Sequence, residues 1–571
     1  MPTKHAPTNR RVLLLWLLPL AFLALFYFYP LGSILTTSFT RGAGLLETFG
    51  EALRSSSIRG VLGFTFLQAT LSTLLTLLVG LPGAYLLARY RFPGKSLFRA
   101  LTGIPFVMPT LVVAAAFNAL LGPRGWLNLG LMDLFNLAAP PVQFVNTFTA
   151  ILVAHVFYNT TIVLRMVGDF WAHLDPHIEQ AARVLGAGRW QTLRRITFPL
   201  LLPAIAAAAL LVFIFDFTSF GVVLVLGGPG FATLEVEIYY QTISLFNLPM
   251  AAALSIVQLV CTLGLTVIYS RLSARLSQPI NLRPQTYTQR PLATWQSKLL
   301  GGTLLIAMLV FFTAPLLGLA ARSVARLEPD RRERIVEDRG LTLDFYRELR
   351  VNRRNALFYA PPSTAIATSL GYAAATVVLA LALGLPASWA LAQHSRAFTS
   401  RLLDPILMLP LGTSAVTLGL GFIVALDQPP LDLRASPLLI PLAHTLVAFP
   451  FVVRSLTPAL RSIQPRLREA AAMLGAGPGQ VIRRIDLPLV GRAMLVAATF
   501  AFTISLGEFG ATALVARPEY PTIPVVIYRL ISQPGALNYG QALALSTILM
   551  IVTATGMLAI ERFRIAEVGE F

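Results

Sequence analysis

Apolar stretches long enough to cross a lipid bilayer recur along this whole chain, and they limit what it can fold into. Crossing a hydrocarbon core of about 30 Å takes around 20 helical residues. We count twelve such stretches, near residues 11–37, 61–89, 100–121, 148–171, 200–227, 250–272, 297–321, 364–393, 402–426, 437–457, 489–515 and 540–562. Only 12% of the 571 residues are charged, against roughly 25% in soluble domains. The expected fold is an all-α integral membrane protein.

The basic residues indicate how the chain is threaded through the membrane. The net charge is +19, but lysines and arginines occur in short clusters between apolar stretches and form no continuous stripe, which argues against a nucleic-acid partner. Cytoplasmic loops carry the excess of lysine and arginine. The clusters fall on one side of the bilayer if both termini are cytoplasmic. The single cysteine, Cys261, excludes a disulfide framework or a cysteine metal site.

One loop departs from this charge rule. Residues 322–354, threaded outside, contain ten arginines and seven acids, namely Glu328, Asp330, Glu333, Glu337, Asp338, Asp344 and Glu348. The segment is either a solvated surface loop or a docking surface for an acidic external partner.

A polar passage occurs twice in the chain. Residues 179–199 and 468–488 are identical at 11 of 21 positions, and the same offset of 289 residues relates His155 to His444 and Ser219-Phe-Gly to Glu508-Phe-Gly. We therefore expect two homologous six-span halves, residues 1–272 and 297–571, joined by a cytoplasmic linker at 273–296, with an external loop at 322–362. Halves with an even number of spans run parallel and enclose a path between them.

Each copy of the passage predicts helix, turn, helix. Gly186 and Gly475 are placed to take the left-handed conformation that ends a helix. A second short helix carries paired arginines and is expected to stop at Pro199 or Pro488, where the next span begins. A lipid-facing interfacial helix requires periodicity but no matched turn positions. The two matched copies therefore predict that another protein recognises both.

The pattern E-A-A-x-x-x-G, followed by I-x-x-P, resembles the cytoplasmic coupling motif of ATP-binding cassette (ABC) importer permeases. The resemblance covers nearly the whole chain, which is similar to fused two-half permeases for thiamine or ferric iron. It implies the type I importer fold, a prokaryotic plasma membrane, two copies of a cytoplasmic ATPase that bind the ATP, and an external substrate-binding protein. The implied coupling residues are Gln180, Ala181, Ala182, Gly186, Ile196 and Pro199 in the first copy, and Glu469, Ala470, Ala471, Gly475, Ile485 and Pro488 in the second.

The chain itself shows no catalytic or metal-binding pattern. Residues 93–96, Pro-Gly-Lys-Ser, lack the first glycine of a P-loop, and Pro176 interrupts the pair His173 and His177. We therefore expect no cofactor on this chain. An ion-driven carrier, which can also have two six-span halves, is the alternative class.

Two acids lie inside the expected fifth spans, where an ionisable group costs roughly 2.5–3.5 kcal/mol. We expect Asp216 and Glu508, with Ser219 and Ser505 at the corresponding positions, to line the translocation path. Together with Glu235 and Glu237 at its outer mouth, they would favour a small cationic substrate, thiamine or ferric iron. The alternative is that each carboxylate is paired with a hydroxyl or an arginine and only holds the bundle together. His155 and His444 are predicted to be packing residues.

Overall fold

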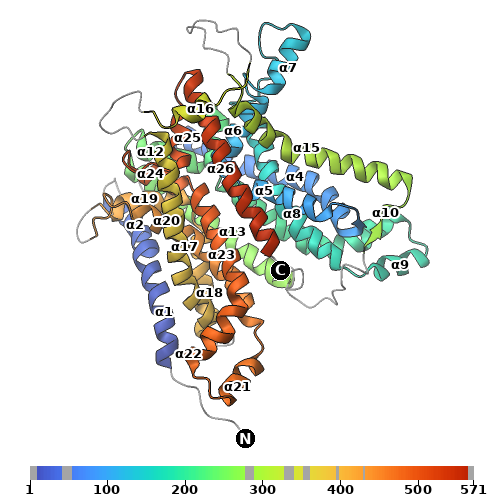
Figure 1. Cartoon of the computed structure of the whole chain (residues 1–571), viewed down its shortest axis with the longest axis vertical. Coiled ribbons are helices and arrows are strands. Elements are labelled where there is room, and N and C mark those ends of the chain that lie inside the picture. The colour runs from blue at the N-terminus through green and yellow to red at the C-terminus, as the bar shows by residue number, and fades with distance from the viewer. Residues whose placement is uncertain are drawn as a thin grey trace.

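The computed structural model is almost entirely helical (Figure 1). It describes residues 9–40, 50, 54–276, 289–326, 340–351, 361–393, 398–427 and 431–563. Within these ranges, eleven helices are long and apolar enough to cross a membrane, and a bent pair brings the number up to twelve. The all-α membrane fold is thus confirmed.

The first half contains most of its residues in long helices linked by short turns. Its elements are α1 (Asn9–Leu23), η1 (Ala24–Phe28), α2 (Tyr29–Thr40), α4 (Ser56–Arg89), β1 (Tyr90–Arg91), α5 (Lys95–Val107), α6 (Thr110–Leu121), α7 (Trp126–Phe135), α8 (Phe148–His173), α9 (Pro176–Val184), α10 (Arg189–Thr192), η2 (Leu193–Thr197), α11 (Phe198–Phe217), η3 (Val223–Gly227), η4 (Gly228–Gly230), α12 (Leu234–Ile243) and α13 (Leu248–Leu276).

The second half repeats this order after a short strand. Its elements are β2 (Arg290–Pro291), α15 (Trp295–Ser323), α16 (Asp344–Glu348), α17 (Pro362–Gln393), α18 (Phe398–Met408), η5 (Leu409–Gly412), α19 (Ala415–Ala425), α20 (Leu439–Arg461), α21 (Pro465–Met473), α22 (Pro478–Val481), η6 (Ile482–Asp486), α23 (Leu487–Gly507), α24 (Gly510–Val515), α25 (Ile523–Ile531) and α26 (Ala536–Phe563).

The third span of each half is broken, so the prediction of single helices over 100–121 and 402–426 was wrong. In the first half, Met108 and Pro109 are extended between α5 and α6. In the second, the segment ending at Gly412 and helix α19 meet at an angle of 97°. Hydropathy does not detect these breaks because the residues on both sides of each are apolar.

The fifth span of each half is broken as well, which corrects the single helices expected over 200–227 and 489–515. Helix α11 ends at Phe217 and α23 ends at Gly507. After Gly507 the chain becomes extended at Glu508, whose carboxylate oxygens accept hydrogen bonds from the amides of Ala511 (2.8 Å) and Thr512 (3.1 Å). A side chain that caps the following helix in this way competes with helix continuation.

The repeated Gly-Leu-Pro of the two halves marks a tight helix crossing. A Cβ atom on Gly80 of α4 would lie 2.7 Å from Cβ of Val163 on α8, and one on Gly384 of α17 would lie 2.5 Å from Cγ1 of Val452 on α20. Small residues allow such close approach between membrane helices. The same contact therefore fixes the second and fourth spans of both halves.

The first span of each half packs against the other half. Trp16, Leu23 and Tyr27 share a buried cluster with residues of α17, α19 and α20, and the hydroxyl of Tyr27 lies 2.6 Å from that of Thr413. Reciprocally, α15 packs against α4, α5 and α6, as Figure 1 shows on the opposite flank from α1. The two halves are therefore interlocked.

Two predicted segments lie partly outside the described residues. In the linker, Tyr90–Arg91 and Arg290–Pro291 form a parallel two-residue pairing that ties the linker to the end of α4. In the expected external loop, α16 packs against α26, with Phe345 close to Gly540. Five of the seven acids predicted there fall at 327–339, outside the described residues. The half and linker boundaries remain predictions.

Candidate functional site

The two repeated passages, residues 179–199 and 468–488, fold alike. Gly186 has φ +89° and Gly475 has φ +80°. In the first copy the amide of Ala187 donates to the carbonyl of Ala182, and in the second the amide of Ala476 donates to that of Ala471, both at 3.0 Å. These bonds close a Schellman turn, which ends a helix through a left-handed residue. Both glycines therefore end a helix in the left-handed conformation, as predicted.

Each turn presents two apolar side chains to solvent. Val184 and Leu185 are 86% and 87% exposed, and their counterparts Met473 and Leu474 are both 89% exposed. In Figure 1, α9 and α10 of the first passage lie at the right edge and α21 and α22 of the second at the lower edge, away from α7 and α16 at the top. Exposed apolar groups of this kind at a matched position in both halves indicate a contact surface for another molecule.

The second helix of each passage does not stop at its proline, which corrects the prediction. Helix α10 runs through the π-turn η2 into α11, and α22 runs through η6 into α23. The amide of Phe198 donates to the carbonyl of Leu193, five residues earlier. Pro199 follows at once, and the wider π-turn accommodates a ring that would otherwise collide with the carbonyl four residues before it.

Different ion pairs hold the two passages: one joins the first passage to α4, and the other lies within the second passage. Glu179 accepts from Arg89 of α4 at 2.5 Å and from the hydroxyl of Thr197 at 3.0 Å. At the corresponding positions in the second half, Arg468 donates to Asp486 at 2.8 Å. Glu179 is thus used within the chain, whereas Gln180 is exposed.

A central cavity of about 370 Å³ lies between the two halves. Asp216, Glu235 and Glu508 contribute three carboxylates to its wall. Its aromatic rings are Phe106, Tyr158, Phe215, Phe220, Phe451, Phe500 and Phe509. All three carboxylates are at most 8% exposed. A pocket that combines aromatic walls with a few polar groups is the usual form of a small-molecule site.

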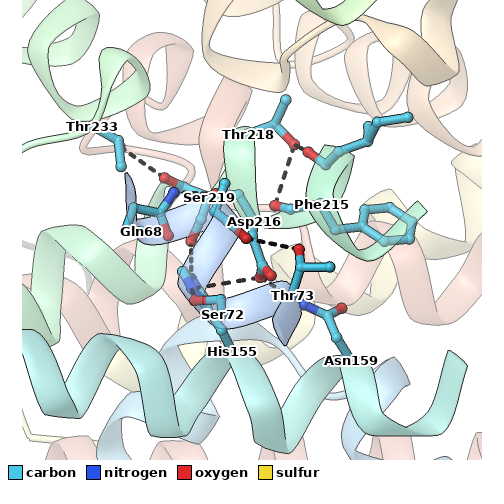
Figure 2. Close-up of polar contacts among 12 residues, drawn as sticks. Gln68, Ser72, Thr73, His155, Asn159, Phe215, Asp216, Thr218, Ser219 and Thr233 are labelled. Carbon is cyan, nitrogen blue, oxygen red and sulfur yellow. Dashed lines mark hydrogen bonds and ion pairs between the residues drawn. The ribbon is translucent and has the colours of Figure 1, made fainter. Parts of the chain in front are cut away.

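Asp216 is held among side chains of α4 and α8 (Figure 2). Its Oδ1 accepts from the Asn159 amide at 2.7 Å and lies 3.5 Å from Nδ1 of His155, while its backbone carbonyl accepts from Gln68 at 2.7 Å. The other ring nitrogen of His155 lies 2.8 Å from the Ser219 hydroxyl. Oδ2 of Asp216 is buried with no hydrogen-bond partner among the described residues.

The second half has the same arrangement with the carboxylate and hydroxyl exchanged. Nδ1 of His444 lies 2.7 Å from the Ser505 hydroxyl, and Nε2 lies 3.3 Å from Oε2 of Glu508. Ser505 stands where Asp216 stands in the first half, and Glu508 stands where Ser219 stands. Each histidine therefore lies between a hydroxyl and a carboxylate of the broken fifth span.

Four aromatic rings meet where the halves join. Phe220 and Phe509 stack with ring centroids 5.4 Å apart, Tyr239 lies 5.3 Å from Phe220, and Tyr528 lies 5.5 Å from Phe509. We refer to these residues as the four-ring cluster. Phe509 lines both the central cavity and a second cavity of about 300 Å³, which Tyr239 and Tyr528 also line. The cluster thus separates the central cavity from the side of the molecule on which α12 and α25 lie.

Residues 80–278 and 381–565 match the family model described as binding-protein-dependent transport system inner membrane component. The chain belongs to this family. It is 27% identical over 491 residues to the thiamine transport system permease protein ThiP of Escherichia coli, covering 84% of this chain and 85% of that one. The PhnU permease of Salmonella typhi, provisionally named for 2-aminoethylphosphonate transport, is 31% identical over 285 residues, 49% of this chain and 98% of its own.

A solved structure is also similar in part. A bacterial ABC transporter involved in the import of the acidic polysaccharide alginate matches with a TM-score of 0.40 and 18% identity, covering 47% of this chain and 98% of its own. The resemblance of this chain to fused two-half ABC importer permeases, expected from the repeated passages, is confirmed by the two family matches and the ThiP relative.

The structure brings the predicted path residues of this permease together. Asp216, Ser219 and Glu508 line the central cavity, whereas Ser505 lies behind it in contact with His444. The carboxylates of Asp216 and Glu508 are also paired with neighbouring side chains. Lining the cavity and holding the helix bundle together are therefore compatible roles. Glu235 was expected at an outer mouth but lies in the cavity wall, bonded to Gln258 (3.0 Å) and to Ser414 of the second half.

Sequence reasoning missed several groups of the permease cavity. His155 was predicted as a packing residue, yet it lines the cavity, with Nδ1 3.0 Å from the Ser72 hydroxyl and 3.5 Å from Oδ1 of Asp216. Tyr158 and Asn159 follow His155 on the same face of α8. These polar side chains on one helix face could have indicated that the face borders a cavity. The ring of Phe220 stacks on that of Phe509, 289 positions away in the chain. In the sequence, this contact was indicated only by the Phe-Gly that the two broken spans share.

Proposed function

We propose that this chain is the membrane-spanning subunit of an ATP-driven importer and that its cargo is thiamine. The observation that carries the proposal is the central cavity, in which three carboxylates and seven aromatic rings surround a space between the halves. Thiamine is a small organic cation with two flat rings. Carboxylates attract its charge, and aromatic faces within about 6 Å attract a cation as well.

Two buried polar atoms in the cavity lack partners among the described residues, namely Oδ2 of Asp216 and the hydroxyl of Tyr158. A buried unpaired polar group costs about 1–3 kcal/mol, so both atoms favour a ligand or water in the cavity. Asp216 is the better candidate for direct contact, because Thr512 and the backbone of α24 already occupy both oxygens of Glu508. The aromatic lining favours an organic cation over ferric iron.

The two repeated passages are the proposed contacts for two ATPase subunits, which would bind the ATP. Their exposed pairs, Val184 with Leu185 and Met473 with Leu474, would each enter an apolar groove on one subunit. Because the second helix of each passage continues unbroken into α11 or α23, a displacement of that helix would be transmitted to the broken fifth span and its carboxylate. In this assignment both termini and both passages are cytoplasmic.

The four-ring cluster is the proposed closure on the external side. Substrate from an external binding protein would reach the cavity when Phe220 and Phe509 separate. ATP binding, by moving α11 and α23, would part the two rings, since each lies within three residues of the end of its helix. Membership in a binding-protein-dependent family displaces the alternative of an ion-driven carrier.

The test is uptake into proteoliposomes that contain the chain with its ATPase and binding protein. We expect ATP-dependent accumulation of radiolabelled thiamine, and none of ferric iron or 2-aminoethylphosphonate. Asp216→Asn is expected to reduce thiamine uptake at least tenfold, whereas Asp427→Asn, on an exposed ion pair with Arg434, serves as the matched control. Uptake of another cargo in place of thiamine refutes the assigned substrate, and full thiamine uptake by Asp216→Asn refutes the role of the carboxylate.

A further inference from the structure

Another cavity, larger than the central one, lies at the side of the first half and away from the central cavity. It has a volume of about 810 Å³ and is bounded by the first repeated passage, the ends of α4 and α11 nearest to it, and the start of α15. We refer to it as the lateral crevice. It shares no lining residue with the central cavity. Its volume falls within the range of roughly 300–1,000 Å³ that is typical of ligand sites.

The lateral crevice carries an excess of positive charge. Arg183, Arg189 and Arg290 line it, and Glu179, the only acid in its lining, is engaged by Arg89 at 2.5 Å. Among the described residues, the side chains of Arg183 and Arg189 make no hydrogen bond or ion pair. Their guanidinium groups are therefore available to a ligand that brings its own negative charge.

Arg290 is held in place by aromatic residues. Its guanidinium lies 5.1 Å from the ring centre of Tyr90 and donates to the hydroxyls of Tyr90 (3.1 Å) and Tyr85 (3.4 Å). The ring of Tyr85 in turn lies 5.1 Å from that of Trp171. Tyrosine and tryptophan are enriched where a membrane protein meets the headgroup layer, so these side chains place the mouth of the crevice at that depth.

The remaining wall is apolar. It contains Leu81, Leu201 and Ile205 from α4 and α11, and on α15 it contains Leu300, which is 73% exposed. A soluble anion would gain nothing from such a wall. A ligand with an anionic head and apolar tails satisfies the arginines and the leucines together.

We propose that the lateral crevice binds an anionic phospholipid of the cytoplasmic leaflet. Its phosphate would accept charge-assisted hydrogen bonds from the three guanidinium groups, and its acyl chains would lie along α11 and α15. Basic pockets between membrane helices on the cytoplasmic side are suited to such headgroups. The bound lipid would connect the first repeated passage to α15, a helix of the other half. The inference depends on the proposed orientation of the chain and is independent of the cargo.

Native mass spectrometry of the purified full chain, titrated with phosphatidylglycerol or phosphatidylcholine, tests the proposal. We expect phosphatidylglycerol to bind at least tenfold more tightly. Replacing Arg183, Arg189 and Arg290 together by Gln is expected to weaken phosphatidylglycerol binding roughly a hundredfold, given the contribution of each basic residue at an anionic surface. The same three positions changed to Lys are expected to retain most of the binding. The matched control replaces Arg194, Arg195 and Arg466 by Gln, because these arginines are exposed and lie outside the crevice.

Three results overturn the proposal. They are equal binding of the two lipids, equal loss in the crevice and control variants, and displacement of phosphatidylglycerol by millimolar inorganic phosphate, which would assign the crevice to a free anion. If the Gln variant does not fold, photoactivatable phosphatidylglycerol with the unaltered chain replaces it. Labelling is then expected within 183–205 and 290–300, and labelling confined to other spans contradicts the site.

Discussion

The exposed apolar pairs of the repeated passages offer a direct test of how this permease is driven. We consider Leu185→Ser in the first passage and Leu474→Ser in the second. In the isolated chain these side chains are 87% and 89% exposed, so they contribute almost nothing to its own packing. Their removal is therefore expected to leave the stability of the permease unchanged and to act only on its association with the ATPase.

The size of the effect follows from the burial that docking would complete. Fully burying a leucine side chain contributes about 1.5–3 kcal/mol, and the serine hydroxyl recovers little of this. One substitution is then expected to raise the Kd for an ATPase subunit roughly 10- to 150-fold, since about 1.4 kcal/mol corresponds to a factor of ten. If the two passages contact separate ATPase subunits, as proposed, the double variant is expected to lose the sum of both free energies.

The assay is titration of purified ATPase against the immobilised permease, with the melting temperature of the permease recorded in parallel. Leu341→Ser is the matched control, because Leu341 is 83% exposed and lies beside Ala325, just before α16 and outside both passages. Unchanged ATPase affinity in both passage variants would refute the reasoning. So would a loss of affinity in the control of the same size, because the effect would then be unrelated to the passages.

Three further changes probe the fold, the gate and the passage. Gly80→Ala is expected to destabilise the chain by about 1–3 kcal/mol through overpacking, measured by thermal unfolding, whereas Gly63→Ala, with no atom within 4 Å, is expected to be neutral or stabilising. Phe509→Ala is expected to open the four-ring cluster and raise passive thiamine efflux from liposomes severalfold. Glu179→Gln removes the charge that faces Arg89 and is expected to weaken the anchoring of the first passage by about 1.5–3 kcal/mol, seen as faster hydrogen exchange there.

Each of these expectations has a contrary result. Equal melting temperatures for the two glycine variants would show that the helix crossing is not tight. Efflux that stays at the unaltered rate would place the gate elsewhere. Exchange that rises equally in both passages would indicate general loosening, because the second passage is fastened by Arg468 and Asp486.

Much of the site could be predicted from sequence because the chain contains an internal repeat. Residues that recur at the same place in both halves stand out without any other sequence. The glycines of the passages were assigned to left-handed turns, and the structure has both with positive φ. The acids Asp216 and Glu508 were assigned to a path because an ionisable group inside an apolar span needs a polar environment. The continuation of each passage through its proline was missed, because a π-turn has no sequence signature comparable to that of an ordinary helix end.

The sequence by itself determined that the chain crosses a membrane with two related halves, since hydropathy and internal identity are local properties that survive without coordinates. Only the tertiary structure decided which residues share the cavity. His155 meets Asp216 and Ser219, and Phe220 meets Phe509, through helix crossings that bring distant segments together. The first half has a carboxylate at Asp216 and a hydroxyl at Ser219, and the second half has them in the opposite order, as Ser505 and Glu508. The structure shows why this exchange is tolerated. Only the position of each histidine in space shows that both arrangements place a carboxylate and a hydroxyl beside its two ring nitrogens, where Ser72 and Thr512 add shorter contacts.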